Sequence, residues 1–237
     1  MRKLIVSALL AGFILGFASC RIVNGNRNVI SETRELESFS KIRLSGIGNL
    51  HLTQGPATGL QITGESNIIS RVRTYVDGDA LVIKTEDGIN IRTHEPVNMY
   101  VSTPDIEKIS VSGAGDIYGE NKWSLNDVLE MHTSGAGKIK AELNGPAVDI
   151  SVSGAGDVIL TGETKDIKAD VSGAGKIKAE ELKSENADVE VSGAGSIYVY
   201  ASVSLKAQVS GAGNVSYWGN PAQVEQHKSG AGSIKKR

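Results

Sequence analysis

The tetrapeptide Ser-Gly-Ala-Gly occurs seven times in this chain of 237 residues. The copies begin at Ser112, Ser134, Ser153, Ser172, Ser192, Ser210 and Ser229, so the spacings are 22, 19, 19, 20, 18 and 19 residues. A degenerate copy, Ser-Gly-Ile-Gly, begins at Ser45. Such a nearly fixed period indicates repeated structural units, each of which buries its hydrophobic face against its neighbours.

Hydrophobic residues alternate with polar residues on both sides of each tetrapeptide. The residue five positions after each serine is always aliphatic: Ile117, Ile139, Val158, Ile177, Ile197, Val215 and Ile234. The residue before the serine is usually valine, and most copies have another hydrophobic residue two positions earlier. Because a period of two is typical of β-strands with one buried face, the repeats predict short strands flanking each tetrapeptide.

These patterns predict an all-β fold, a β-solenoid or parallel β-helix with coils of about 19 residues and Ser-Gly-Ala-Gly corners. Glycine at such a corner permits a positive φ angle and leaves room for the next coil. We expect the alanine between the glycines to point into a narrow interior. The serine hydroxyls are expected to form a row along the edge.

Charged residues repeat in phase with the corners. Four residues before each serine stand, in order, Lys108, Glu130, Asp149, Lys168, Asp188, Lys206 and Glu225. Five of these six successive steps pair opposite charges. Opposite charges on neighbouring strands attract by about 0.2–1 kcal/mol for each exposed pair. The pattern therefore predicts coils that stack in register, while burial of the aliphatic columns supplies most of the stability.

The amino-acid composition predicts an aliphatic core and excludes both a disordered protein and a strongly basic nucleic-acid-binding protein. Hydrophobic residues make up 40% of the chain, which excludes wholesale disorder. Aromatic residues make up only 5%, so the core is expected to consist of thin aliphatic layers. The 25 lysine and arginine residues are balanced by 27 aspartate and glutamate residues. This balance excludes a nucleic-acid-binding protein that relies on bulk positive charge.

The first twenty residues resemble a bacterial lipoprotein signal. Arg2 and Lys3 precede an apolar run over residues 4–17, and two small residues then lead to Cys20. The run is too short for a comfortable transmembrane helix. We predict a signal peptide over residues 1–19 and lipid attachment at Cys20, the only cysteine in the chain. The mature protein is expected in the cell envelope, anchored in the outer membrane and facing either the periplasm or the outside.

The remaining chain is expected to have three parts. These are an N-terminal tether over residues 20–31, diverged β coils or a separate β-subdomain over residues 32–110, and the regular solenoid over residues 111–237. Strands in the diverged part are expected at 60–63, 71–76, 80–84 and 99–102, with turns at 77–79 and 87–88. Polar residues at 226–228 replace the usual pattern in the last repeat, which suits a terminal coil that blunts an exposed edge.

A known family shares these features. The repeated Ser-Gly-Ala-Gly-x-Ile strands, the segment Phe39–Leu44 and the segment Tyr217–Pro221 resemble the putative auto-transporter adhesin, head GIN domain family. The resemblance covers about residues 32–235. It implies an exported, often lipid-anchored, β-helical protein, and it brings no catalytic residues.

No metal or cofactor is expected. Asp116 and Asp157 follow glycine-rich corners, as in calcium-binding β-helices, but Lys138 and Lys176 take the same position in alternate coils. Because a calcium ion there is held between adjacent coils, the lysines would exclude it. The four histidines, His51, His94, His132 and His227, lack the spacing of metal ligands and are expected to be solvated or edge residues.

Several aromatic residues are expected on or near the outer surface: Tyr118, Tyr198, Tyr200, Tyr217 and Trp218. They either cover an edge or end of the solenoid or stack on a sugar or a partner protein. The sequence does not identify a ligand-binding set among them.

We therefore expect a non-catalytic, membrane-tethered binding or scaffold module with an adhesin-like role, with a glycan or an envelope protein as its partner. The alternative is a polysaccharide-active enzyme on the same scaffold, because carboxylates are abundant. That enzyme would need a groove in which Asp or Glu residues cluster with Arg or Lys.

Overall fold

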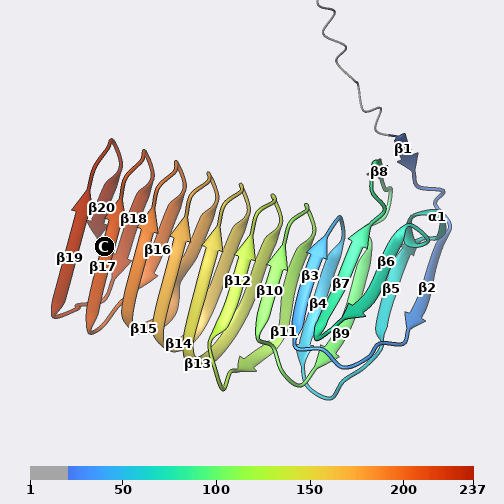
Figure 1. Cartoon of the computed structure of the whole chain (residues 1–237), viewed down its shortest axis with the longest axis horizontal. Helices are drawn as coiled ribbons and strands as arrows, with labels where there is room; N and C mark the ends of the chain where they lie inside the picture. Colours follow the sequence, from blue (N-terminus) through green and yellow to red (C-terminus); the bar gives the residue numbers. More distant parts are fainter. Residues whose placement is uncertain (1–20) are drawn as a thin grey trace, which may run out of the picture.

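The protein is a parallel β-solenoid of about six stacked turns, as seen in a computed structural model that describes residues 21–237 (Figure 1). Each regular repeat contributes one strand before its Ser-Gly-Ala-Gly corner and one strand after it. Strands before the corners stack into one sheet, here called the pre-corner sheet, and strands after the corners stack into the post-corner sheet. The predicted all-β solenoid is confirmed.

The two sheets share three long strands, which leave the post-corner sheet, bend and join the pre-corner sheet of the next coil. These are β13 (Lys138–Val152), β14 (Asp157–Val171) and β15 (Lys176–Val191). The other pre-corner strands are, in spatial order, β6 (Val72–Asp77), β7 (Ala80–Thr85), β3 (Lys41–Ser45), β10 (Lys108–Val111), β12 (Leu129–Thr133), β17 (Ser204–Val209) and β19 (Gln223–Lys228). The other post-corner strands are β2 (Val29–Arg34), β5 (Leu60–Glu65), β9 (Asn98–Thr103), β4 (Asn49–Gln54), β11 (Asp116–Ser124), β16 (Ser196–Tyr200), β18 (Asn214–Trp218) and β20 (Ser233–Lys236).

The seven tetrapeptides lie in one row, which forms the upper edge of the solenoid in Figure 1. Backbone hydrogen bonds connect each corner to the preceding one. The N–H of Ala155 donates to the carbonyl oxygen of Gly135 (3.0 Å), and the N–H of Ala174 donates to that of Gly154 (3.0 Å). The predicted stacking of the corners is therefore present in the structure.

Crowding, rather than a left-handed backbone, explains the corner glycines. Of the seven copies, only the last contains a glycine with positive φ, Gly230 at 138°. The expectation of positive φ at the corners was therefore wrong for the other six. A Cβ atom added to Gly173 would lie 2.1 Å from the carbonyl oxygen of Gly154, and one added to Gly175 would lie 2.1 Å from that of Gly156. The stacked backbones leave no space for a side chain at either position.

The alanine of each corner is exposed, so the expectation that it points inward was wrong. The second glycine is the buried residue instead, because the turn interrupts the alternation of inward and outward positions. A Cβ on Gly175 would meet Cγ1 of Val152 at 2.7 Å. The corner serines are also exposed, and they stand in a row from coil to coil: the N–H of Ser153 donates to the Thr133 carbonyl (2.9 Å), and that of Ser172 donates to the Val152 carbonyl (3.0 Å).

The core consists of aliphatic columns that run along the solenoid. The residue five positions after each corner serine has no exposed surface from Ile117 to Val215, and Ile234 is partly buried in the last coil. Trp123 is fully buried in the coil that is 22 residues long, next to the point where that coil takes up its extra residues. The thin aliphatic core expected from composition is thus observed.

The N-terminal part does not stack in sequence order. β3 and β4 pack directly against β10 and β11, whereas β7 and β9 stack on the opposite side of β3 and β4 although they come later in the chain. Antiparallel pairs involving β2, β5 and β6, together with α1 (Ser66–Ile69), close this end. Strands occur at all four expected places, and Gly78 and Gly88 have positive φ in the expected turns.

Part of the expected tether is structured. β1 (Arg21–Asn24) pairs in parallel with β8 (Ile89–Arg92), and β2 begins at Val29. Within the described part of the chain, no helix has the length and hydrophobicity needed to cross a membrane.

The last coil places polar groups where earlier coils bury hydrophobic ones. Gln226 pairs in register with Ala207, and Lys228 pairs with Val209. Every residue of β19 is exposed. Polar and charged side chains on an edge strand discourage pairing with another chain, as the sequence predicted for the terminal coil.

Candidate functional site

A column of charged side chains crosses the pre-corner sheet, four residues before each corner serine. The strands pair these residues in register from Lys108 to Glu225. Three steps carry an ion pair: Lys108 Nζ to Glu130 Oε2 (2.6 Å), Lys168 Nζ to Asp149 Oδ2 (3.4 Å) and Lys206 Nζ to Asp188 Oδ2 (3.1 Å). Attraction to the Asp149 carboxylate, reinforced by a hydrogen bond, raises the pKa of Lys168 above its ordinary value. The predicted stacking of charges in register is confirmed.

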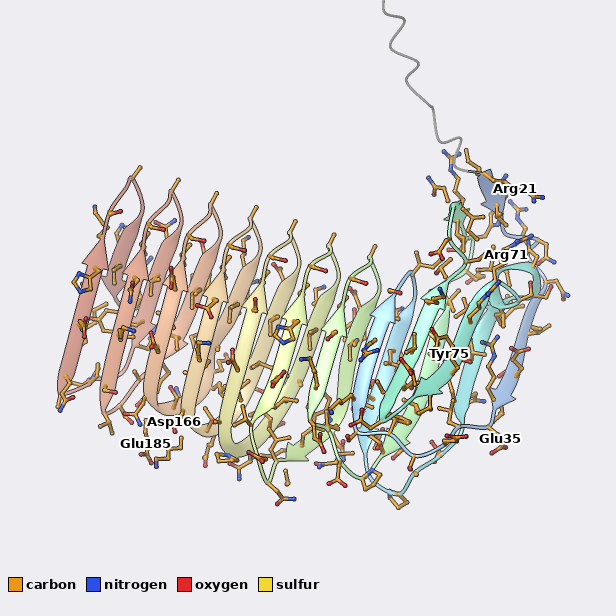
Figure 2. All side chains as sticks on the ribbon, viewed as in Figure 1. Arg21, Glu35, Arg71, Tyr75, Asp166 and Glu185 are labelled. Carbon is orange, nitrogen blue, oxygen red and sulfur yellow. The ribbon has the colours of Figure 1, made fainter. Side chains whose placement is uncertain are left out.

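A groove of about 620 Å³ runs beside this column across β13, β14, β15, β17 and β19; we call it the ladder groove. One wall is the charged column from Asp149 to Glu225. The other wall is the column six residues before each corner serine: Ala147, Asp166, Asn186, Ser204 and Gln223. Figure 2 shows Asp166 near the bend opposite the corners. Val128 and Val224 also line the groove and are 44% and 46% exposed.

Hydrogen bonds connect the second wall from coil to coil. The Asn186 amide donates to Asp166 Oδ1 (2.8 Å), and the Ser204 hydroxyl donates to Asn186 Oδ1 (2.7 Å). The sequence patterns one to four residues before each serine do not include this wall, which stands six residues before. Counting backward by six finds it, because the differences in coil length are taken up earlier in the coil, as at the register shift between Ile159 and Thr161.

The predicted aromatic residues do not form one surface. The rings of Tyr198 and Trp218 lie 6.5 Å apart and tilted on the post-corner sheet, and Lys183 Nζ lies 4.1 Å from the ring centre of Tyr200. Tyr217 is only 7% exposed and belongs to the core, so its expected place on the outer surface was wrong.

Tyr118 belongs to a separate stack of rings near the N-terminal end. His51 lies between Tyr100, at 4.5 Å between ring centres, and Tyr118, at 5.6 Å. His51 Nδ1 also contacts Glu120 Oε1 at 2.5 Å. One of the two ring contacts in this stack could be predicted from the sequence, because His51 and Tyr118 both stand six residues after a corner serine. Tyr100 has no corner before it and was missed.

The four histidines lie apart, as their spacing suggested. Each contacts a carboxylate: His51 with Glu120, His94 with Glu65, His132 with Glu130 and His227 with Glu225. Among residues 21–237, no group of three or more His, Cys, Asp or Glu side chains has the geometry of a metal site. The predicted signal peptide over residues 1–19 and the predicted lipid attachment at Cys20 lie outside the described residues.

The fold and its surface define a class of protein: a parallel β-solenoid with grooves that run across its coils. The family model of the putative auto-transporter adhesin, head GIN domain, matches residues 38–221 of this chain. The chain belongs to this family. No curated protein matches it in sequence.

Solved structures share the fold over nearly the whole chain. A putative adhesin from Bacteroides fragilis is 27% identical, with a TM-score of 0.86 over 91% of this chain and 100% of that chain. A putative lipid binding protein from Parabacteroides distasonis is 20% identical, with a TM-score of 0.77 over 92% of this chain and 100% of that chain. A putative adhesin from Parabacteroides merdae is 19% identical, with a TM-score of 0.71 over 92% and 99%.

Proposed function

We propose that this chain is a lipid-anchored module of the cell envelope that binds an extended polar partner, a glycan or an envelope protein, without catalysing a reaction. The ladder groove carries this proposal, because a charged residue repeats in every coil along one wall and polar residues from Asp166 to Gln223 line the other. The family's description as an adhesin, and that of the Bacteroides fragilis relative, supports a binding role.

The ladder groove suits a partner that lies along the solenoid axis. Neighbouring strands of a sheet are about 4.8 Å apart, so an extended polymer meets a new charge at that interval. In the last three coils it also meets a new amide or hydroxyl, from Asn186, Ser204 and Gln223. The ion pairs in the charged wall are solvent-exposed, and such pairs contribute at most about 1 kcal/mol each. A partner's polar groups can therefore replace them at little cost.

The arrangement of carboxylates supports binding over glycoside hydrolysis. A glycosidase uses two carboxyl groups in different environments, one protonated and one ionised. In the ladder groove, Asp149 and Asp188 each face a lysine of the next coil in the same kind of ion pair. These two carboxylates share one environment, so they do not form a distinct acid and base.

A tryptophan in the middle of the ladder groove should block binding. Liposomes carrying the full chain would be incubated with intact bacteria and with purified envelope glycans, and bound liposomes counted by flow cytometry. We expect Ser204→Trp to reduce binding about tenfold, the equivalent of about 1.4 kcal/mol. Ser151→Trp is the matched control, since Ser151 faces outward on the same sheet but lies outside the ladder groove. Equal binding by both variants would rule out the ladder groove, and no binding by the native chain would leave only a scaffold role.

Membrane attachment depends on Cys20, which immediately precedes β1 at the end of the solenoid opposite the C-terminus (Figure 1). We expect the native chain to fractionate with the outer membrane and to carry a lipid mass on its N-terminal peptide. Cys20→Ser should lose the lipid mass and no longer fractionate with the outer membrane. A variant that still fractionates with the outer membrane as the native chain does would contradict the lipid anchor. Protease treatment of intact cells then tells whether the solenoid faces the outside or the periplasm.

A further inference from the structure

A second hollow, of about 470 Å³, lies on the post-corner sheet near the N-terminal end and crosses β2, β5, β9 and β4. One side is the row Thr33, Gln61, Tyr100 and His51, which the strands pair in register. The other side is formed by Thr53 and Ser102, also paired in register, together with Thr58 and Gly59. We call this site the hydroxyl hollow. It lies on the opposite sheet from the ladder groove.

Gly59, which lines the hydroxyl hollow, lets its loop pack closely against β2. A Cβ atom at this position would lie 2.9 Å from the carbonyl oxygen of Arg34 and 3.3 Å from Cγ2 of Thr33. The neighbouring loop is fixed by two hydrogen bonds: Thr58 N–H donates to the Ser102 carbonyl, and Ser102 N–H donates to the Thr58 hydroxyl, both at 3.1 Å. The shape of the hollow is therefore set by paired backbone.

The chemistry of the lining is unusual for this protein. No aspartate, glutamate, lysine or arginine lines the hydroxyl hollow, whereas the ladder groove and the three other described hollows are all lined by such residues. Its polar side chains include three threonines, one serine and one glutamine. Hydroxyl and amide groups both donate and accept hydrogen bonds, so they match a ligand whose groups also do both. A charged ligand would lose hydration there without meeting an opposite charge.

Tyr100 supplies an aromatic wall. Its side chain is 44% exposed, yet its ring is held in place by stacking on His51 with only 14° between the planes. The contact from Glu120 to His51 Nδ1 holds the second ring in turn. A pre-oriented ring beside hydrogen-bonding groups is the usual composition of a site for an amphipathic ligand.

We propose that the hydroxyl hollow binds a neutral oligosaccharide. A sugar ring has an apolar face of C–H groups, which suits the Tyr100 wall, and hydroxyls around its edge, which suit the threonines, Ser102 and Gln61. The volume falls within the range of about 300–1,000 Å³ that is typical of small-ligand sites. A peptide that adds a strand within the hollow is disfavoured, because β5, β9 and β4 already have a partner on each edge and the edge of β2 that faces them is paired with β5.

The test is calorimetric titration of the full chain, purified in a detergent without a sugar headgroup. The probes are tetrasaccharides of cellulose, xylan, mannan, amylose and chitin, with tetragalacturonate as a charged comparison. We expect millimolar or tighter binding of at least one neutral probe, weakened about tenfold or more by Tyr100→Ala. Thr33→Val, which keeps the side-chain volume at an exposed position and removes the hydroxyl, should also weaken it.

Tyr75→Ala is the matched control, because Tyr75 is 46% exposed and lies on β6 of the other sheet (Figure 2). It should leave the affinity unchanged. The proposal is overturned if no neutral probe binds, if only tetragalacturonate binds, or if Tyr75→Ala and Tyr100→Ala weaken binding equally. If only the ladder-groove proposal fails, Ser204→Trp binds as well as Ser151→Trp in the liposome assay, while Tyr100→Ala still weakens binding in this titration.

Discussion

Gly173→Val is expected to lower the free energy of unfolding by at least about 3 kcal/mol, which corresponds to a fall in Tm on the order of 10 °C. The first added carbon would lie 2.1 Å from the carbonyl oxygen of Gly154 and 2.5 Å from that of Ser153. The Gly154 carbonyl accepts hydrogen bonds from the N–H groups of Ala174 and Gly175, at 3.0 and 3.1 Å. Moving the Gly154 carbonyl aside would break both hydrogen bonds, so the corner cannot relax without losing further free energy.

Ala174→Val provides the control within the same corner. It produces the same valine side chain at the neighbouring residue, whose existing Cβ is exposed. We expect a Tm within about 2 °C of the native value, in keeping with exposed substitutions. Thermal unfolding followed by circular dichroism compares the two variants. If both have the same Tm, the corner glycines are not required by coil stacking.

The periodic part of the fold could be predicted from the sequence because its rules are local. Lys168 and Asp188 are neighbours in space since each stands four residues before a corner serine. The same arithmetic places His51 beside Tyr118 and Asn186 beside Ser204, and it locates one wall of the ladder groove. What determines these contacts is the constant number of residues between a corner and its flanking strands.

The remainder could not be predicted because the alternation rule fails inside turns and outside the repeat. Within the corner, the sequence does not tell whether Ala174 or Gly175 faces inward; the crowding of stacked backbones decides it. In the N-terminal part, β9 pairs with β4 through residues 49 apart, and no tetrapeptide marks that register. The hydroxyl hollow depends on this long-range pairing, which brings Tyr100 to His51. The site could therefore not be predicted from the sequence.

The closed N-terminal end depends on one buried carboxylate. Glu65 has no exposed surface, and its oxygens accept hydrogen bonds from Arg27 N–H (2.6 Å), His94 N–H (2.9 Å) and His94 Nδ1 (3.1 Å). Burial alone would raise the pKa of Glu65. The hydrogen bonds from the backbone N–H groups of His94 and Arg27, with the His94 side chain, outweigh it and hold the pKa below the ordinary 4.5. The ionised form thus joins the segment before β2 to the segment before β9.

Glu65→Gln should therefore destabilise the protein in a pH-dependent way. At pH 7 the amide NH₂ would face a backbone donor, and we expect Tm to fall on the order of 5 °C. Because the folded-state pKa of Glu65 is lowered, its contribution is complete above about pH 5 and is lost as the pH falls through the folded-state pKa, below 4.5. The Tm difference between native and variant proteins should accordingly shrink in acid.

Glu130→Gln is the control. It removes a carboxylate from an exposed pair and should change Tm little at any pH. A Tm difference for Glu65→Gln that stays constant from pH 7 into acid would show that the carboxylate charge does not hold this end closed.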